Sequence, residues 1–425
     1  MYIIPKVSII VPSLNSIKYI HECIDSVLNQ TLKDIEIICV DAGSTDGTLE
    51  MLREYEKNDN RLKVIFSDKK SYGYQINLGI KEAKGEYLGI VESDDYIKEN
   101  MYEDLYKIAR EKKCDIVKGD VLNFWDKEER IYECRLLNWT EVLYNKILNF
   151  KTDKRILTES NIVNPSGIYK LDFIKKYNIL CNETPGSAFQ DTGFWFQLQV
   201  LADSIFLVKD AYYYYRQDNV NSSCNSRAKV YCICDEYDYI EQFVSKNNFY
   251  NILPIVNYLR YRGYRWNLYR ICFNYRLEFL YKIQKDFKRL EVLSKNSFSL
   301  FKKWELIQLR EIIFDPKKFY CEVARHKQGA VEYTKNTSEY KLGKKIISCR
   351  KYKEFVALLK EENMQLTSDL EKKYCDYYEG KSYEEHLSYK IGKIVLQSKR
   401  KENYIAVIFL RILFCCVCHK LKSRK

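Results

Sequence analysis

Three carboxyl groups lie within four residues at Glu92-Ser93-Asp94-Asp95, directly after an apolar run. Carboxylates this close repel one another unless a cation or exposure to water relieves them. A hard cation such as Mg²⁺ or Mn²⁺ does so by sharing one or two carboxylates with the oxygens of a diphosphate. The pattern leaves one alternative open, in which Asp94 or Asp95 caps the helix that follows.

A further acidic residue, Asp191, lies in the run Gln190-Asp191-Thr192-Gly193. A carboxylate within hydrogen-bond reach of a hydroxyl group can take its proton as a general base. The same residue can instead cap a helix that begins at this point. From the residues alone, both interpretations stay open.

The elements that must position these groups alternate along the first hundred residues. Short apolar runs predict strands at 7–11, 35–40, 62–66 and 87–91, the first of them ended by Pro12. Apolar residues at helical spacing separate these strands, which favours a parallel sheet with helices on both faces. In such sheets ligands bind beyond the carboxyl ends of the strands. The polar residues found there are Ser13, Asn15, Asp41 and the run Glu92–Asp95.

The rest of the chain is organised differently. Residues 111–225 are less regular, although the run Tyr212–Tyr215 predicts another strand. Residues 226–425 are helical in pattern, rich in Tyr and basic, with few Gly or Pro. We therefore expect an α/β domain over 1–225, with a donor-binding half at 1–110 and an acceptor half at 111–225, followed by a helical C-terminal region.

Composition limits the classes of function. The 425-residue chain carries a net charge of +12, which favours anionic partners, but no nucleic-acid-binding motif is present. Its 15 Cys lack the paired spacing of a zinc site, and its four His are scattered. No signal peptide precedes the first strand, and no apolar run is long enough to span a membrane, so we expect a cytoplasmic protein with free thiols. Neither a P-loop nor a dinucleotide-binding glycine motif occurs.

Six motifs occur in one order along the first hundred residues and together closely resemble the family 2 glycosyltransferases of the GT-A fold. They are Lys6–Asn15 (KVSIIVPSLN), Ser26–Thr31 (SVLNQT), Val40–Gly47 (VDAGSTDG), Asn77–Gly79 (NLG), Ala83–Tyr87 (AKGEY) and Glu92–Asp95 (ESDD). Two later segments resemble motifs of bacterial members, namely Gly186–Phe194 (GSAFQDTGF) and Tyr215–Ser223 (YRQDNVNSS).

The resemblance implies a role for each matching residue. The base and ribose of a nucleotide-sugar donor would be surrounded by Pro12, Ser13, Asn15 and Asp41. The diphosphate would lie against Glu92, Ser93, Asp94 and Arg216, with the Asn221–Ser223 stretch near it, and a Mg²⁺ or Mn²⁺ ion would be held by Asp94 and Asp95. Asp191 would be the catalytic base of an inverting transfer to a hydroxyl group.

Three positions depart from the family pattern. Ala42 stands where members commonly have an acidic or amide residue that contacts the base, which weakens the case for uridine, although a UDP-sugar remains the favoured donor. Leu14 stands where many members have Tyr, and Glu92 opens the metal motif in place of the usual Asp.

The implied function is metal-dependent hexosyl transfer in the synthesis of a bacterial surface polysaccharide, onto a glycan or lipid-linked acceptor. Two alternatives remain: a nucleotidyltransferase or nucleotide-sugar hydrolase, and a non-catalytic GT-A-like module kept for binding or assembly. We expect no nucleic-acid partner.

Two C-terminal segments carry patterns of their own. Tyr352 to Leu370 has a 4-3 apolar spacing that fits either an amphipathic helix or a short coiled coil, and so an oligomer. Residues 403–425 are apolar at their centre and flanked by basic residues, which fits contact with the inner face of the cell membrane or packing on the helical region.

Overall fold

The computed structural model describes residues 4–219, 222, 229–293, 297–326, 328–348, 370, 374 and 376–398. The chain divides into two compact units, Met1–Gly263 and Tyr264–Lys425. The domain boundary predicted at residue 225 lies inside the first unit. Helix α8 (Cys232–Lys246), which follows that boundary, packs on α7 (Gln190–Leu201) of the same unit. The separate roles expected for residues 1–110 and 111–225 stay a prediction.

The first unit is built on a 10-stranded mixed sheet in which β7 and β8 branch from the order β3-β2-β1-β4-β9-β6-β10-β5. The pairs β1–β2, β2–β3, β1–β4 and β6–β10 are parallel, while β9 runs antiparallel between β4 and β6. The strands are β1 (Val7–Ser13), β2 (Ile35–Asp41), β3 (Leu62–Phe66), β4 (Tyr87–Ile90), β5 (Tyr96–Ile97), β6 (Ile116–Asp126), β7 (Arg130–Arg135), β8 (Ile147–Leu148), β9 (Gly167–Lys170) and β10 (Ile205–Arg216).

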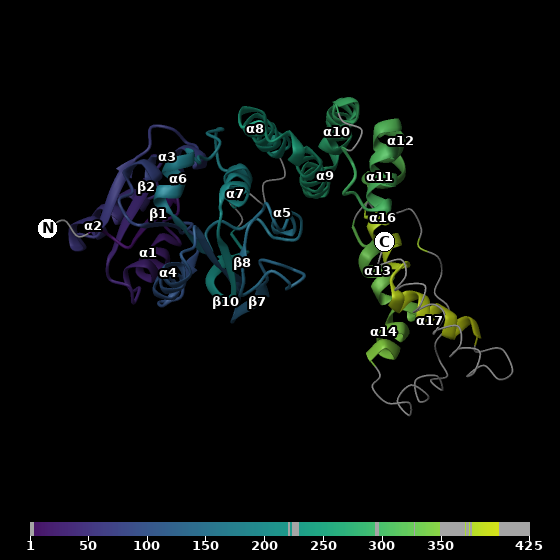
Figure 1. Cartoon of the computed structure of the whole chain (residues 1–425), viewed down its shortest axis with the longest axis horizontal. Coiled ribbons are helices and arrows are strands. Elements are labelled where there is room, and N and C mark those ends of the chain that lie inside the picture. Colours follow the sequence, from purple (N-terminus) through teal and green to yellow (C-terminus); the bar gives the residue numbers. More distant parts are fainter. Residues whose placement is uncertain are drawn as a thin grey trace. The chain divides into compact units, whose positions relative to one another are not determined.

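Helices cover both faces of this sheet, as the alternating pattern predicts. Helix α3 (Tyr72–Glu82) packs on β1 and β2, and α4 (Met101–Lys112) packs on β6 and β9. In Figure 1, α3 and α6 (Leu171–Tyr177) lie on one side of β1 and β2, while α1 (Ile20–Leu28) and α4 lie on the other. Every residue of β1 is buried, because a parallel strand covered on both faces has no side turned to water.

The expectation that Pro12 ends the first strand is wrong. Strand β1 continues to Ser13, and Pro12 pairs in register with Val40 of β2. Pairing with β4, on the other side, ends at Ile10, whose carbonyl oxygen accepts the backbone N–H of Val91. Because successive residues of a strand face opposite neighbours, the missing N–H of Pro12 falls on the side that β4 has already left.

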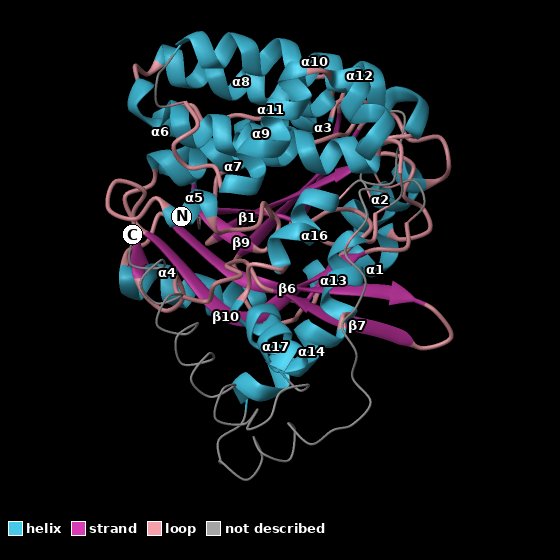
Figure 2. Ribbon diagram, turned by 90° about the vertical axis from the view of Figure 1, so that its right-hand side faces the viewer, coloured by secondary structure: helices cyan, strands magenta, loops and turns pink. Residues whose placement is uncertain are grey.

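Within residues 111–225, β6 pairs with both β7 and β10, and Figure 2 shows the three as neighbouring strands. The strand predicted at Tyr212–Tyr215 is confirmed as the end of β10. Two register shifts against β6, near Ala211, separate the two parts of β10. Helix α2 (Thr48–Asn58) covers β3, and the short helix α5 (Arg155–Thr158) packs on α7.

Helix α3 approaches β1 closely at one point. A Cβ atom added to Gly79 would lie 2.7 Å from three side-chain atoms of Ile10. Only glycine allows this contact, which fixes the height of α3 above the sheet. The height matters because the first turns of α3 carry Tyr72 and Gln75, whose side chains reach the carboxyl edge of the sheet.

The second unit is helical, as predicted for the C-terminal region. Helices α14 (Ser338–Ser348) and α17 (Leu387–Ser398) cross so closely that a Cβ on Gly343 would lie 1.5 Å from the carbonyl oxygen of Ser388. Among the described residues, no helix is long and apolar enough to span a membrane. The 352–370 pattern falls almost wholly, and the 403–425 tail wholly, outside the described residues. The helices that follow α8 are α9 (Leu253–Arg270), α10 (Phe273–Leu293), α11 (Lys303–Phe314), α12 (Pro316–Phe319), α13 (Ala330–Asn336), α14 (Ser338–Ser348), α16 (Tyr377–Tyr383) and α17 (Leu387–Ser398).

Candidate active site

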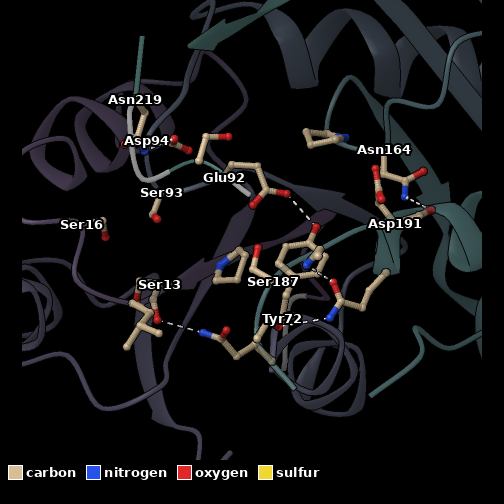
Figure 3. A pocket seen from close by; sticks show the side chains of 18 of the residues that line it. Ser13, Ser16, Tyr72, Glu92, Ser93, Asp94, Asn164, Ser187, Asp191 and Asn219 are labelled. Atoms are coloured by element: carbon tan, nitrogen blue, oxygen red, sulfur yellow. Dashed lines mark hydrogen bonds between the residues drawn. The ribbon is translucent and has the colours of Figure 1, made fainter. Parts of the chain in front are cut away.

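A cavity of about 480 Å³ opens at the carboxyl edge of the sheet, inside the first unit. Its walls come from the loop after β1, the first turns of α3, the acidic turn after β4, the loop before α7 and the end of β10. Figure 3 shows Ser13, Ser16, Ser93 and Asp94 on one side and Asn164 and Asp191 on the other. The sequence-predicted residues that line it are Pro12, Ser13, Asn15, Glu92, Ser93, Asp94, Asp191 and Arg216.

Asp41 is not among the lining residues, and its contact with the donor stays a prediction. Its side chain is fully buried and accepts hydrogen bonds from the Ser13 hydroxyl at 2.9 Å and the Ser44 hydroxyl at 2.6 Å. It also accepts the backbone N–H groups of Gly43 and Ser44. Asp41 therefore holds the loops after β1 and β2 together, and it orients Ser13 at the cavity wall.

Asn15 also joins the loops that follow β1 and β2. It adopts a φ of 53°, a left-handed conformation that Asn tolerates better than most residues. Its side-chain oxygen accepts the backbone N–H of Thr45 at 2.9 Å, and its own N–H donates to the Ser44 hydroxyl. Leu14 beside it is 39% exposed and lines the cavity.

The three carboxyl groups of the acidic turn have three different surroundings. Asp94 lines the cavity and accepts a hydrogen bond from the Asn219 amide at 2.7 Å. Glu92 also lines the cavity and accepts the Tyr72 hydroxyl at 2.7 Å. Burial of this carboxyl group raises the pKa of Glu92 to about 8, so at neutral pH it holds its proton most of the time.

Asp95 points away from the cavity, and the expectation of an exposed strand end is wrong here, since Asp95 is 2% exposed. Its two oxygens accept the Tyr213 hydroxyl at 2.6 Å and the backbone N–H of Arg216 at 2.7 Å. Burial and the charge of Asp94 raise its pKa. In this structure Asp95 joins the acidic turn to β10, and its role as a metal ligand stays a prediction.

Arg216 lines the cavity, but its guanidinium group is already engaged. It donates to the carbonyl oxygen of Asp94 at 2.9 Å and pairs with Glu22 at 3.0 Å and with Asp126. The ring of Tyr19 lies 4.5 Å from its central carbon. The expected contact of Arg216 with a diphosphate stays a prediction. Of the stretch expected near the diphosphate, Asn221 and Ser223 lie outside the described residues.

The donor set for a divalent metal is small. Within the described residues, no group of three or more His, Cys, Asp or Glu side chains is arranged to hold an ion. Asp94 is a carboxylate of the acidic turn that lines the cavity and is half-buried. Mg²⁺ and Mn²⁺ sites that share one or two carboxylates with substrate phosphates need no more than this, so the residues fit an ion brought by the diphosphate.

Asp191 lies in the first turn of α7 and lines the cavity. The residue that precedes the helix is Phe189, at a φ of 68° and without a side-chain cap, so Asp191 is not the N-cap residue. Burial raises the pKa of Asp191 to about 6, against the opposing effect of nearby backbone N–H groups, the charge of Arg135 and the Thr192 side chain. A carboxylate of this pKa is ionised at neutral pH and more basic than an exposed Asp.

Several residues of the site carry no motif of their own in the sequence. Tyr213 accepts the backbone N–H of Glu92 while donating to Asp95. Gln75 donates to the carbonyl oxygens of Ser13 and Val40, which ties α3 to the strand ends. Only the order of the strands in the sheet could have identified Tyr213 from the sequence, because β10 lies beside β6 and the end of β10 reaches the acidic turn.

Comparisons with known proteins agree with this architecture. The family model for glycosyl transferase family 2 matches residues 8–167. Glycosyltransferase GlyG of Streptococcus pneumoniae serotype 4 is 36% identical over 218 residues, which are 50% of this chain and 70% of GlyG. The uncharacterized glycosyltransferase EpsJ of Bacillus subtilis is 46% identical over 114 residues, 27% of this chain and 33% of EpsJ.

Among solved structures, the S. aureus TarS 1-349 complex with UDP-GlcNAc has a TM-score of 0.55 at 19% identity, covering 74% of this chain and 90% of that one. This likeness concerns the fold, which is of the GT-A type, with a mostly parallel sheet and a helical C-terminal region. The cavity of this chain lies at the strand ends of that fold. The chain belongs to glycosyltransferase family 2.

The structural role of Asp95 predicts a loss of stability. Asp95→Ala leaves the Tyr213 hydroxyl and the Arg216 N–H buried without their partner, which should cost about 2–4 kcal/mol of the free energy of unfolding. Asp94→Ala is the matched control, because Asp94 is only half-buried, and it should cost about 1 kcal/mol or less. Urea denaturation measures both, and equal losses would contradict the distinction.

The buried carboxyl group of Glu236 predicts a pH dependence of stability. It accepts the backbone N–H of Gly193 at 3.1 Å and the Asn182 amide at 3.0 Å, and burial raises its pKa to about 8. Because the folded state binds this proton more tightly than the unfolded state, stability should be full below pH 4.5 and fall as pH rises through 8, by roughly 3–5 kcal/mol.

This prediction is checked by denaturation of wild type and Glu236→Gln between pH 5 and 9. The difference in unfolding free energy between the two should shrink or change sign as pH rises. Glu128→Gln, at an exposed position of the β6–β7 turn, controls for the loss of one charge. Parallel curves for wild type and Glu236→Gln would show that Glu236 does not titrate on unfolding.

Proposed function

We propose that this glycosyltransferase moves a hexosyl group from a nucleoside diphosphate donor to an acceptor hydroxyl, with inversion at the anomeric carbon. The observation that carries this proposal is one cavity with two unlike sides. Asp94 and Ser93 face it on the donor side, and Asp191, with a pKa of about 6, faces it on the other. The two predicted halves, 1–110 and 111–225, would each supply one side.

In the proposed reaction the nucleotide lies against Pro12, Ser13 and Asn15, with its diphosphate toward Ser93 and Asp94. The buried hydroxyl group of Ser16, which lines the cavity and has no partner among the described residues, is available to the donor. Asp191 accepts the proton of the acceptor hydroxyl as its oxygen attacks the anomeric carbon. Attack from the side opposite the leaving group inverts that carbon.

A Mg²⁺ or Mn²⁺ ion would be held by Asp94 together with the diphosphate. When bound, it supplies positive charge to the leaving diphosphate. Three features of this chain act beside it. Tyr72 holds Glu92 in place, Asn219 holds Asp94, and the engaged Arg216 keeps the acidic turn fixed at the rim.

A UDP-sugar is the proposed donor. TarS, the structural neighbour, is described in complex with UDP-GlcNAc and with UDP. The buried Ala42 offers no polar contact to a base, so base selection would rest on backbone groups near Asn15 and Leu14. Family membership and the proposed base Asp191 at the cavity favour sugar transfer over hydrolysis or nucleotidyl transfer. The same two features argue against a non-catalytic assembly module.

We propose a cytoplasmic location at the inner face of the cell membrane, with a glycan or lipid-linked acceptor of a surface polysaccharide. The supporting feature is the sequence of residues 403–425, where an apolar segment is flanked by basic residues. The polar lining of the cavity suits a nucleotide and a sugar hydroxyl, and no nucleic acid is part of the proposal.

Donor and metal binding can be tested without knowledge of the acceptor. UDP should raise the melting temperature of the protein, and Mn²⁺ should increase this rise. At a ligand concentration 100-fold above Kd, the gain in the free energy of unfolding is about 2.7 kcal/mol. Asp94→Asn should lose the part that depends on Mn²⁺, because it removes the carboxylate that faces the diphosphate. Asp191→Asn is the matched control and should respond like wild type. Equal shifts with EDTA and with Mn²⁺ would overturn the metal role.

The role of Asp191 predicts a separation of binding from transfer. Asp191→Asn keeps the size of the side chain but cannot accept the proton. The rate at which radiolabelled sugar is transferred to a cell extract that contains the glycan or lipid-linked acceptor should therefore fall about a hundredfold or more. Donor binding and the free energy of unfolding should stay near the wild-type values. If turnover is retained while stability is lost, Asp191 has only a structural role in α7. Release of free sugar in place of product would identify a hydrolase.

A further inference from the structure

The side of the cavity that holds Asp191 carries more positive charge than the proposed reaction uses. Arg135, at the end of β7, lines the cavity there with Ile162, Val163 and Asn164. Its charge acts on two neighbours, lowering the pKa of both Asp191 and Lys118. The mechanism proposed above requires only the Asp191 carboxylate on this side, so these cations need another explanation.

Arg135 is half-buried and has no hydrogen bond or ion pair to its guanidinium group from any residue that the structure describes. This contrasts with Arg216 across the cavity, which pairs with Glu22 and Asp126. Arg130 on the same strand pairs with the same two carboxylates. A guanidinium group that is partly removed from water and left without a carboxylate is a ready partner for an oxyanion, which it can bind with two parallel hydrogen bonds.

Lys118 adds a second positive group behind Arg135. It is 2% exposed, and its ammonium group donates to the carbonyl oxygen of Val163. Burial and the charge of Arg135 lower the pKa of Lys118 to about 7, while the charge of Asp191 opposes this shift. One carboxylate, Asp191, thus faces two basic side chains, and an anion bound at Arg135 would restore the balance of charge.

Asn164 provides an independent sign that a polar ligand belongs on this side. It is 1% exposed, lines the cavity, and donates from its amide nitrogen to the backbone carbonyl of Asp191 at 2.9 Å. Its side-chain oxygen is buried without any hydrogen-bond partner. Figure 3 shows Asn164 beside Asp191. An unsatisfied buried acceptor is costly, and a hydroxyl group of a bound ligand would satisfy it.

We propose that the acceptor substrate of this enzyme carries a phosphate or carboxylate group, which Arg135 binds while Asn164 accepts a hydrogen bond from an acceptor hydroxyl near Asp191. This acceptor-anion site rests on the proposed function, because it assigns the Asp191 side of the cavity to the acceptor. It defines the acceptor as anionic and excludes a neutral oligosaccharide as the preferred substrate.

The donor diphosphate is the other anion that Arg135 could bind, and the layout of the cavity argues against it. Ser93 and Asp94, which face the proposed diphosphate position, lie on the opposite side of the cavity from Asp191 and Asn164 in Figure 3. The charge of Arg135 lowers the pKa of Asp191 and of Lys118, which places this charge near the Asp191 side of the cavity. Its charge is therefore placed for the acceptor.

The test uses the full chain saturated with UDP and Mn²⁺ and four small probes. Two probes are anionic, sn-glycerol 3-phosphate and D-glucuronate, and two are their neutral counterparts, glycerol and D-glucose. Calorimetric titration of wild type should show at least about tenfold tighter binding of one anionic probe than of its neutral counterpart. Arg135→Gln should reduce this preference to about twofold or less, and the phosphate and carboxylate arms show which group is preferred.

Two controls make each outcome decisive. Lys127→Gln removes one positive charge from the exposed turn of the same hairpin and should behave as wild type. The affinity for UDP should be unchanged in Arg135→Gln. If wild type binds UDP but shows no preference for an anionic probe, the acceptor-anion site is wrong and the proposed function stands. Weaker UDP binding in Arg135→Gln would assign this residue to the donor and overturn the proposal, and no UDP binding by wild type would overturn both.

Discussion

The geometry of the site depends on a buried carboxyl group that joins two distant parts of the chain. Asp95 accepts the Tyr213 hydroxyl and the backbone N–H of Arg216, and Tyr213 in turn accepts the backbone N–H of Glu92. These bonds hold the acidic turn after β4 on the end of β10. Because Arg216 then donates to the carbonyl oxygen of Asp94, the cavity-facing carboxylate has little freedom to move. Buried polar groups of this kind stabilise a structure only when every partner is present.

A single short run of acidic residues thus divides into three functions. Asp94 remains available to ligands, Glu92 is bonded to Tyr72 and mostly protonated near neutral pH, and Asp95 is structural. The mutual repulsion expected of three neighbouring carboxylates is relieved by burial, which favours the protonated forms, and by hydrogen bonds from β10. Burial and these hydrogen bonds therefore hold the turn together, and Asp94 remains at the cavity wall.

Local patterns in the sequence were enough to predict the sheet, its helices and the edge where the site lies, because buried parallel strands and their covering helices leave strong periodic signals. They were not enough to assign orientation within a turn. Asp41 and Asp95 have the same residue type as Asp94, yet both are directed inward by partners far away in the sequence. The prediction that Pro12 ends the first strand failed for the same reason. Whether β1 can contain a proline at this position depends on where the neighbouring strand β4 ends. Arg135 lies in no motif, and its position follows only from the β6–β7 pairing.

The base and the proposed acceptor site are linked by one balance of charge. Burial raises the pKa of Asp191 to about 6, and Arg135, with the N–H groups at the start of α7, opposes that rise. An anion bound at Arg135 would cancel part of this opposition and make the Asp191 carboxylate more basic once the acceptor is in place. The same cation that selects the acceptor thereby keeps the base ionised in the empty enzyme and allows it to strengthen when its substrate binds.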